Sequence, residues 1–119
     1  MKQPWVSIGS DGSALATSGP LRNGVPHPRN FGTFPRVLGK YVREERVITL
    51  EQAIHKLTFH VASIFGLEGR GLLRPGYAAD LTIFDPKTVG AHEPEWANDY
   101  PAESKRLIQK SAGLHYTIV

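Results

Sequence analysis

Asp11 is the residue best placed to do chemistry in this 119-residue chain. It is the only acidic residue among the first 43, and it lies in the turn 9–12 (GSDG), directly after a β-branched and aromatic run at residues 5–9. In an α/β layer the loop after a strand presents catalytic side chains to a crevice, so Asp11 could be a catalytic carboxylate. The alternative is an ordinary turn in which the carboxylate accepts a nearby N–H, and spacing alone favours that alternative.

Arg29 is a second candidate, because it follows His27 and a proline in the segment 27–29 (HPR). An arginine held by an adjacent proline can present a planar, bidentate guanidinium to a carboxylate. Residues 1–43 hold six basic residues and one acidic residue, although the net charge of the whole chain is only +3. This loop therefore favours an anionic partner, while a surface arginine in a mobile loop is the commoner alternative.

The histidines provide no metal site by their spacing. His55 and His60 are about 140° apart around one continuous helix, and His92 and His115 have no ligand nearby. No H-x-H or H-E-x-x-H pair occurs, and the absence of cysteine excludes a thiol nucleophile and a cysteine-ligated metal. We therefore expect this chain to hold no zinc by itself.

Length and composition exclude several classes of protein. The chain is long enough for one small domain but not for a complete eight-stranded α/β barrel, which needs about 250 residues. It has no apolar block that could span a membrane, no signal peptide, and no basic–aromatic stretch typical of nucleic-acid binding. We expect a soluble, cytoplasmic protein without a membrane or nucleic-acid partner.

The elements that must position the candidate residues are a strand, a loop and two helices. The residue types predict a strand at 5–9, an irregular proline-rich loop at 13–35 and a helix at 36–45. Residues 49–52 (TLEQ) form a capping box in front of an apolar stripe, which predicts a helix. It should end at Gly66. The residues expected to face inward near its end are Val61, Ile64 and Phe65.

The second half of the chain has a strand-like texture. Residues 72–73 and 81–84 predict two short strands around the turn 74–76, and a helical piece is expected at 102–110. The final strand, at 114–119, stops at the last residue, so we expect a truncated chain.

Three segments in this order resemble the C-terminal part of the N-acyl-D-amino-acid deacylases, the D-aminoacylase branch of the zinc-dependent amidohydrolases. They are residues 9–12 (GSDG), 27–39 (HPRNFGTFPRVLG) and 69–86 (GRGLLRPGYAADLTIFDP). The third segment is typical of amidohydrolases in general, whereas the second points to the deacylase branch.

The resemblance implies an α/β fold, the C-terminal fragment of a TIM-type metal-dependent hydrolase barrel followed by part of a small β domain. Residues 1–66 would supply the last strand, the long loop and helices of the barrel, and residues 67–119 part of the β-sandwich domain. The family's metal ligands lie on earlier strands, which have no counterpart here. We therefore expect zinc in the parent enzyme, none held by this chain, and no activity from the chain alone.

The resemblance also implies roles for the three candidate residues. Asp11 would match the aspartate that takes a proton from the metal-bound water and later delivers it to the leaving amine. Arg29 would match the arginine that holds the α-carboxylate of an N-acyl-D-amino acid, with His27 beside it as a substrate-binding residue.

Two other classes of function stay open. The chain could be a non-catalytic α+β module that binds an anionic partner through its basic loop. It could also be a subunit that completes its active site with another chain, or with the missing N-terminal portion of the barrel.

Overall fold

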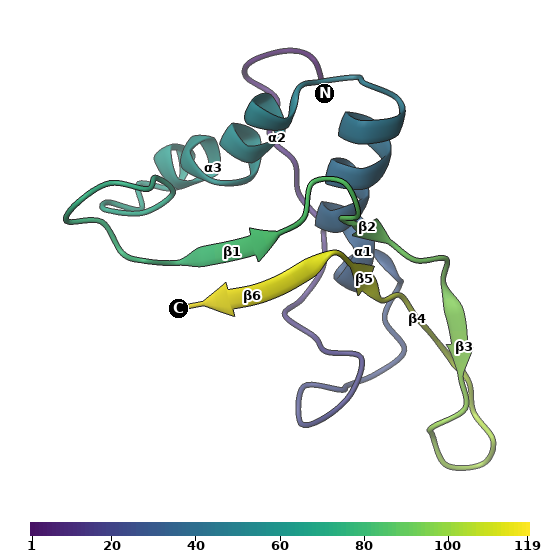
Figure 1. The fold of residues 1–119 in the computed structure, drawn as a ribbon. Helices are drawn as coiled ribbons and strands as arrows, with labels where there is room; N and C mark the ends of the chain where they lie inside the picture. Colours follow the sequence, from purple (N-terminus) through teal and green to yellow (C-terminus); the bar gives the residue numbers. More distant parts are fainter.

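Helices and strands occupy separate parts of the computed structural model, which describes residues 1–119 (Figure 1). The helical segments come first, and short strands fill the second half of the chain. In chain order the elements are α1 (Arg29–Arg36), the π-helix η1 (Val37–Glu44), α2 (Leu50–Leu57), α3 (Phe59–Ile64), β1 (Leu81–Phe84), β2 (Gly90–Ala91), β3 (Glu95–Ala97), β4 (Arg106–Ile108), β5 (Ser111–Ala112) and β6 (Leu114–Ile118). None of the helices has the length and apolar character needed to cross a membrane.

The strands form three antiparallel pairs that nest around one turn. β1 pairs with β6, β2 with β5 and β3 with β4, so the second half of the chain folds back on itself (Figure 1). Leu81 lies opposite Ile118 in the outer pair, so the strands predicted at 81–84 and 114–119 are confirmed, and they are partners. No barrel closes among these strands, and the chain has a mixed helix and strand fold.

Two predictions for this half are wrong. Residues 72–73 form no strand, because β1 takes β6 as its partner. The helix predicted over 102–110 is replaced at its centre by β4, in which Arg106 and Ile108 are buried and the residue between them is not. This alternation with period two is typical of a strand that buries one face. Over only three residues, the sequence pattern of such a strand cannot be distinguished from a weak helical pattern.

The loop predicted over 13–35 ends earlier than expected, because α1 begins at Arg29 and continues directly into η1. Pro35 lies inside α1, where it lacks the N–H that a helical bond requires. The wider π-helical turn follows it, and Pro35, Val37 and Leu38 are all buried. Burial of this face therefore outweighs the proline penalty, and the helix predicted after Pro35 is confirmed as η1.

Thr49 caps α2 as predicted. Its hydroxyl oxygen accepts the backbone N–H of Gln52 at 3.2 Å, and the Gln52 side-chain oxygen accepts the Thr49 N–H at 3.0 Å. Ala53 is fully buried on the face that this cap orients. The other members of the predicted stripe pack against the same core: Leu50, Ile54 and Leu57.

The helix predicted to end at Gly66 is broken before it reaches that residue. Thr58 has φ −127° and ψ −95°, outside the helical region, and α3 begins after it. Gly66 has the predicted left-handed conformation, with φ +64°. Because the break rotates the apolar positions, Ala62 is buried whereas Ile64 and Phe65 are 58% and 73% exposed, so the prediction that these two face inward is wrong.

The core lies where η1 and α2 meet the segment before β2. Its buried members are Val37, Leu38, Ile48, Ala53 and Val89. Gly39 lets the two backbones approach, because a Cβ at this position would lie 2.8 Å from the carbonyl oxygen of Val89. This small apolar core is one of the contacts that join the helical half to the stranded half.

Residues 5–9 do not form the predicted strand, because no strand of the chain pairs with them. A side chain from α2 holds the residues just before and within this segment. The Lys56 ammonium, 4% exposed, donates to the carbonyl oxygens of Gln3 at 2.6 Å and Val6 at 2.7 Å.

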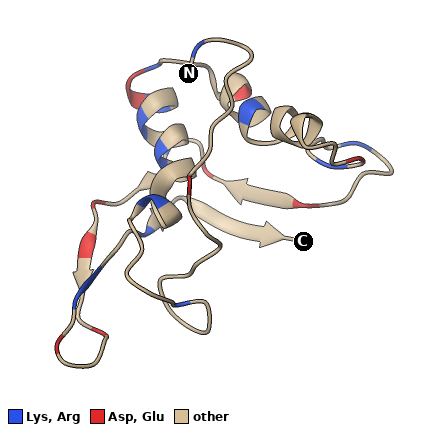
Figure 2. Ribbon diagram, turned by 180° about the vertical axis from the view of Figure 1, so that it is seen from behind, with Lys and Arg blue, Asp and Glu red and all other residues tan.

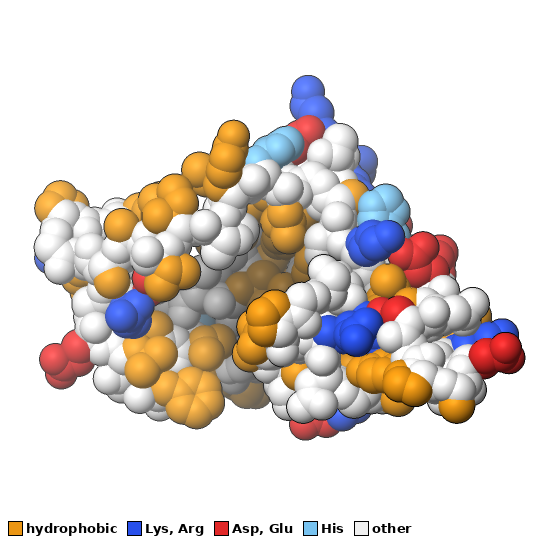
Figure 3. Space-filling view, turned by 90° about the horizontal axis from the view of Figure 1, so that it is seen from below, with side chains coloured by type: hydrophobic (Ala, Val, Ile, Leu, Met, Phe, Trp, Pro, Cys, Tyr) orange, Lys and Arg blue, Asp and Glu red, His pale blue; other side chains and the backbone are white.

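Exposed apolar side chains cover much of the face shown in Figure 3. Every residue of β6 is exposed, so no other element of the chain covers the side chains of this strand. The most exposed large apolar side chains of the whole chain are Val119, Leu73, Phe65, Trp5 and Val25. An apolar surface of this kind is typical of a face that packs against another body.

Candidate functional site

The structure brings Asp11, His27 and Arg29 together. The Arg29 Nη2 atom lies 2.9 Å from Asp11 Oδ2, and Arg29 Nε donates to the Asp11 carbonyl oxygen at 3.1 Å. The backbone N–H of Arg29 donates to His27 Nδ1 at 3.1 Å. The three candidate residues therefore form one contact group, although the intervening loop has no regular secondary structure.

Asn30 fixes the turn 9–12 against the start of α1. Its side-chain oxygen accepts the Ser13 N–H at 2.7 Å, and its side-chain nitrogen donates to the His27 carbonyl at 2.9 Å. A Cβ on Gly12 would lie 2.7 Å from the Asn30 side-chain oxygen, so this close approach requires glycine. The sequence does not indicate this role of Asn30, because the two residues that it binds, Ser13 and His27, lie at different ends of the loop.

Asp11 and Arg29 remain accessible within this arrangement. The Asp11 side chain is 88% exposed and the Arg29 side chain 48% exposed. An ion pair at such a position is screened by water and contributes little to stability. It can therefore exchange one partner for a ligand without unfolding its surroundings.

The guanidinium of Arg29 has one edge engaged and one edge open. The edge with Nε and Nη2 faces the carbonyl and the carboxylate of Asp11. No contact of Nη1 is present. The edge with Nη1 and Nη2 can therefore donate to a second carboxylate in the bidentate geometry that arginine favours.

Arg29 also lines a hollow of about 370 Å³. Its lining includes His27, Arg29 and Arg36, and no acidic residue. Figure 2 shows basic residues recurring along the helix formed by α1 and η1. The charge of this region therefore favours an anion, as the sequence predicts.

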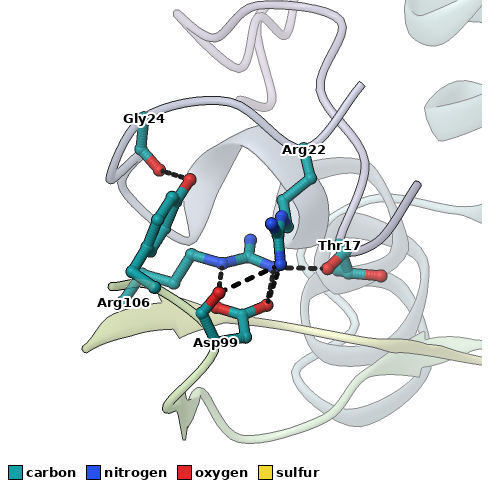
Figure 4. Close-up of polar contacts among 6 residues, drawn as sticks. Thr17, Arg22, Gly24, Asp99 and Arg106 are labelled. Atoms are coloured by element: carbon teal, nitrogen blue, oxygen red, sulfur yellow. Dashed lines mark hydrogen bonds and ion pairs between the residues drawn. The ribbon is translucent and has the colours of Figure 1, made fainter. Parts of the chain in front are cut away.

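A second polar cluster joins the loop between Asp11 and Arg29 to the segment around Asp99 and Arg106 (Figure 4). Arg106 is 1% exposed, and its Nε and Nη2 atoms donate to the two carboxylate oxygens of Asp99 at 2.9 and 2.8 Å. Arg22 Nη1 also lies 3.2 Å from this carboxylate. Hydrogen bonds from Arg106, followed by the charges of Arg106 and Arg22, lower the pKa of Asp99 to about 2. The sequence did not predict this cluster, because an isolated arginine in a short strand is part of no periodic pattern.

The pH dependence of stability tests this cluster. The pKa of Asp99 is about 2 in the folded chain and near 3.8 when unfolded, so the unfolded state binds more protons between these values. The stabilisation is present above about pH 4 and is lost as the pH falls toward 2. We expect the difference in free energy of unfolding between wild type and Asp99→Asn to be largest above pH 4 and to shrink below it.

Urea unfolding from pH 2 to pH 7 would measure this difference. Hydrogen bonds also lower the pKa values of Glu51 and Asp85, but these groups affect both proteins equally. A difference that stays constant across this pH range would contradict the assignment.

His55 and His60 lie closer together than the sequence predicts, with ring centroids 5.6 Å apart. An angle of about 140° holds only on one continuous helix, and the break at Thr58 changes the rotation between the two side chains. No group of three or more His, Cys, Asp or Glu residues could hold a metal ion. That this chain holds no zinc by itself stays a prediction.

Comparison with known proteins relates the chain to one family. Residues 5–119 match the model of the family described as "Amidohydrolase family". The chain is 49% identical over 112 residues to an N-acyl-D-aspartate deacylase of Alcaligenes xylosoxydans xylosoxydans, with 94% of this chain and 19% of the relative covered. It is 45% identical over 94 residues to a D-aminoacylase of the same organism, covering 79% of this chain and 18% of that relative.

A solved structure agrees with these relatives. The N-acyl-D-glutamate deacylase of Bordetella bronchiseptica, complexed with zinc and a phosphonate inhibitor, matches with a TM-score of 0.72 and 40% identity. The match covers 98% of this chain and 21% of that protein. The chain thus spans about a fifth of the length of the proteins that it matches.

Proposed function

Because this chain belongs to the amidohydrolase family, we propose that it provides the proton-transfer and carboxylate-binding residues of a hydrolase that cleaves the amide bond of N-acyl-D-amino acids. The observation that carries this proposal is the contact of Arg29 with Asp11, 18 positions earlier in the sequence. A carboxylate that can transfer a proton and a cation that can hold a substrate carboxylate lie side by side in this contact. The choice of N-acyl-D-amino acids rests on the names of the relatives.

Asp11 acts on the water that attacks the acyl carbonyl. Its carboxylate accepts a proton from this water while the water oxygen bonds to the carbonyl carbon. The protonated Asp11 then donates that proton to the amide nitrogen as the C–N bond breaks. A carboxylic acid and a D-amino acid leave, and Asp11 returns to its ionised form.

Arg29 and His27 hold the substrate. The open edge of the Arg29 guanidinium binds the α-carboxylate of the substrate through two parallel N–H donors. Because His27 Nδ1 accepts the Arg29 N–H, a neutral His27 carries its proton on Nε2, which can donate to the same carboxylate. The Asp11 contact orients Arg29 until the substrate arrives.

The chain contains no group of three or more His, Cys, Asp or Glu residues that could hold a metal ion. A zinc ion for such a reaction would be bound by residues outside the 119, on the same polypeptide or on another chain, so we expect the chain alone to be inactive. The division into residues 1–66 and 67–119 and the cytoplasmic location stay predictions. A non-catalytic module that binds an anion through the same loop is the alternative function, and it would bind without turnover.

Replacing Arg29 by alanine in a complete enzyme that contains this chain tests the proposal. We expect KM for N-acyl-D-amino acids with a free carboxylate to rise by about 10- to 100-fold, because the charged hydrogen bonds to the carboxylate are lost. KM for the same substrates with the carboxylate capped as an amide should change little. Steady-state kinetics on both substrate series measure this difference.

Arg74→Ala is the matched control, because Arg74 is exposed and lies against the Tyr77 ring, away from the contact group. It should leave both series unchanged. An equal loss on free and capped substrates in Arg29→Ala would refute the carboxylate role.

A further inference from the structure

The turn between β3 and β4 lies against the loop that joins Asp11 to Arg29, here named the joining loop (residues 12–28). Arg106 Nη2 donates to the Thr17 carbonyl oxygen at 2.5 Å, and the Tyr100 hydroxyl donates to the Gly24 carbonyl oxygen at 2.6 Å (Figure 4). The first contact joins residues 89 positions apart in the sequence, and the second joins residues 76 positions apart. The turn and the first residue of β4 therefore hold the joining loop at two points.

Side chains of the joining loop also reach toward the turn. Arg22 Nη1 donates to the Asp99 carbonyl oxygen at 3.1 Å and pairs with its carboxylate at 3.2 Å. The Arg22 guanidinium lies 5.3 Å from the centroid of the Tyr100 ring. The contact between the loop and the turn is thus formed from both sides.

The joining loop has little else to determine its path. It contains no helix or strand. Near its ends Leu15 is half-buried and Pro28 is buried, but in its middle Leu21 and Val25 are 59% and 69% exposed. Its own backbone hydrogen bonds include those from Ala16 to Leu21 and from Arg22 to Gly19. Residues 18–25 are all exposed, so no apolar burial holds the middle of the loop, and its polar contacts with the turn decide where this part runs.

Arg106 is suited to this task by its geometry rather than by its contribution to stability. Asp99 binds two of its nitrogen atoms in parallel, which fixes the guanidinium plane and aims Nη2 at Thr17. Its Nη1 atom is buried without a hydrogen-bond partner. A buried ion pair is often no more stable than apolar side chains of the same volume, so its main effect is to impose one arrangement.

We propose that Arg106 and Tyr100 are positioning residues, which hold the joining loop so that Arg29 stays against Asp11 and in register with the substrate carboxylate. The catalytic consequence rests on the proposed function, whereas the anchoring of the loop does not. Neither residue touches the substrate carboxylate, and both act through the loop.

Amide hydrogen exchange on the 119-residue chain tests the anchoring without any need for activity. Tyr100→Phe removes one hydroxyl and keeps the ring, and Arg106→Lys keeps the charge but loses the bidentate fork. We expect both variants to exchange the amides of Ala16 and Arg22 about tenfold faster than wild type. Unchanged exchange in the joining loop of Tyr100→Phe would overturn the proposal, and this conservative variant covers the case in which Arg106→Lys does not fold.

Glu95→Gln is the matched control. Glu95 lies in β3 and pairs at 2.7 Å with Lys110, two residues after β4, so this change weakens a contact beside the β3–β4 pair and none with the joining loop. It should leave the exchange of Ala16 and Arg22 at the wild-type rate. Faster exchange of these two amides in the control would mean that any damage to the pair loosens the loop, which would also overturn the specific role of Arg106 and Tyr100.

Kinetics in a complete enzyme test the consequence for substrate binding. We expect Tyr100→Phe to raise KM for substrates with a free carboxylate by about tenfold and to change KM for amide-capped substrates little, because a small displacement of Arg29 weakens only the carboxylate contact. Faster exchange with unchanged KM would overturn the positioning role. A wild-type enzyme that hydrolyses no N-acyl-D-amino acid would instead refute the proposed function, and the exchange result would still decide whether the loop is anchored.

Discussion

Replacing Asp11 by asparagine in a complete enzyme that contains this chain should lower kcat by about 10³-fold, because the amide of asparagine cannot accept the proton of the attacking water. The change keeps the size of the side chain, and the Asp11 side chain is 88% exposed, so the fold should not change. Arg29 would lose a charged partner but keep the Asp11 main-chain carbonyl oxygen, which accepts from its Nε. KM for the substrate should therefore change much less than kcat.

The measurement is steady-state kinetics combined with metal analysis of the same purified protein. The zinc content should stay close to that of the wild type, so that the loss of turnover cannot be attributed to a loss of metal. Glu93→Gln is a suitable control, because it removes one exposed carboxylate from the stranded half of the chain and should leave kcat unchanged. Near-normal turnover in Asp11→Asn would exclude Asp11 as the proton carrier.

Replacing Lys56 by methionine should lower the free energy of unfolding of the chain by about 3 kcal/mol. The Lys56 ammonium has three N–H donors, and it faces three carbonyl oxygens, those of Gln3 at 2.6 Å, Pro4 at 3.3 Å and Val6 at 2.7 Å. Methionine keeps the buried stem but donates to none of them. The segment that leads into the turn 9–12 would lose its polar connection to α2.

Urea or thermal unfolding measures this loss, and we expect the midpoint of thermal unfolding to fall by about 10 °C. Lys105→Met is the matched control, because Lys105 is exposed and takes part in no ion pair. It should unfold within about 0.5 kcal/mol of the wild type. Equal midpoints for Lys56→Met and wild type would show that water replaces the ammonium without cost.

The sequence predicted the features whose interactions are local. The capping box at Thr49 joins residues three positions apart, so its geometry follows from the helix itself. The same holds for the left-handed conformation of Gly66, where the lack of a Cβ is the deciding property. Helical and strand periodicity likewise placed η1, β1 and β6, because each repeats over several adjacent residues.

The sequence predicted which residues belong to the candidate site, but it did not predict which of them are in contact. The charge distribution and the glycine-flanked turn pointed to Asp11 and Arg29 one by one. Their ion pair depends on the path of the joining loop, and that path depends on Arg106 and Tyr100, which come from the other half of the chain. An isolated arginine or tyrosine has no periodic signature, so residue spacing could not predict these contacts.

The errors have a related physical cause. The strand expected at residues 5–9 needs a hydrogen-bonding neighbour, and the Lys56 ammonium from α2 takes the Val6 carbonyl instead. The break at Thr58 changes the rotation of every later residue, which exposes Ile64 and Phe65 and brings His55 and His60 together. A helical wheel assumes a constant rotation per residue, so it cannot predict such a break.

By itself, the sequence determined which residues are chemically suited to the site, the positive charge around them, and the caps and periodic faces of the elements. The tertiary structure decided which of these residues meet, where the proline-containing helix begins, and which strands pair. The difference has one reason: local interactions are set by the identities of nearby residues, whereas distant contacts depend on how the whole chain packs its few apolar faces and satisfies its buried polar groups.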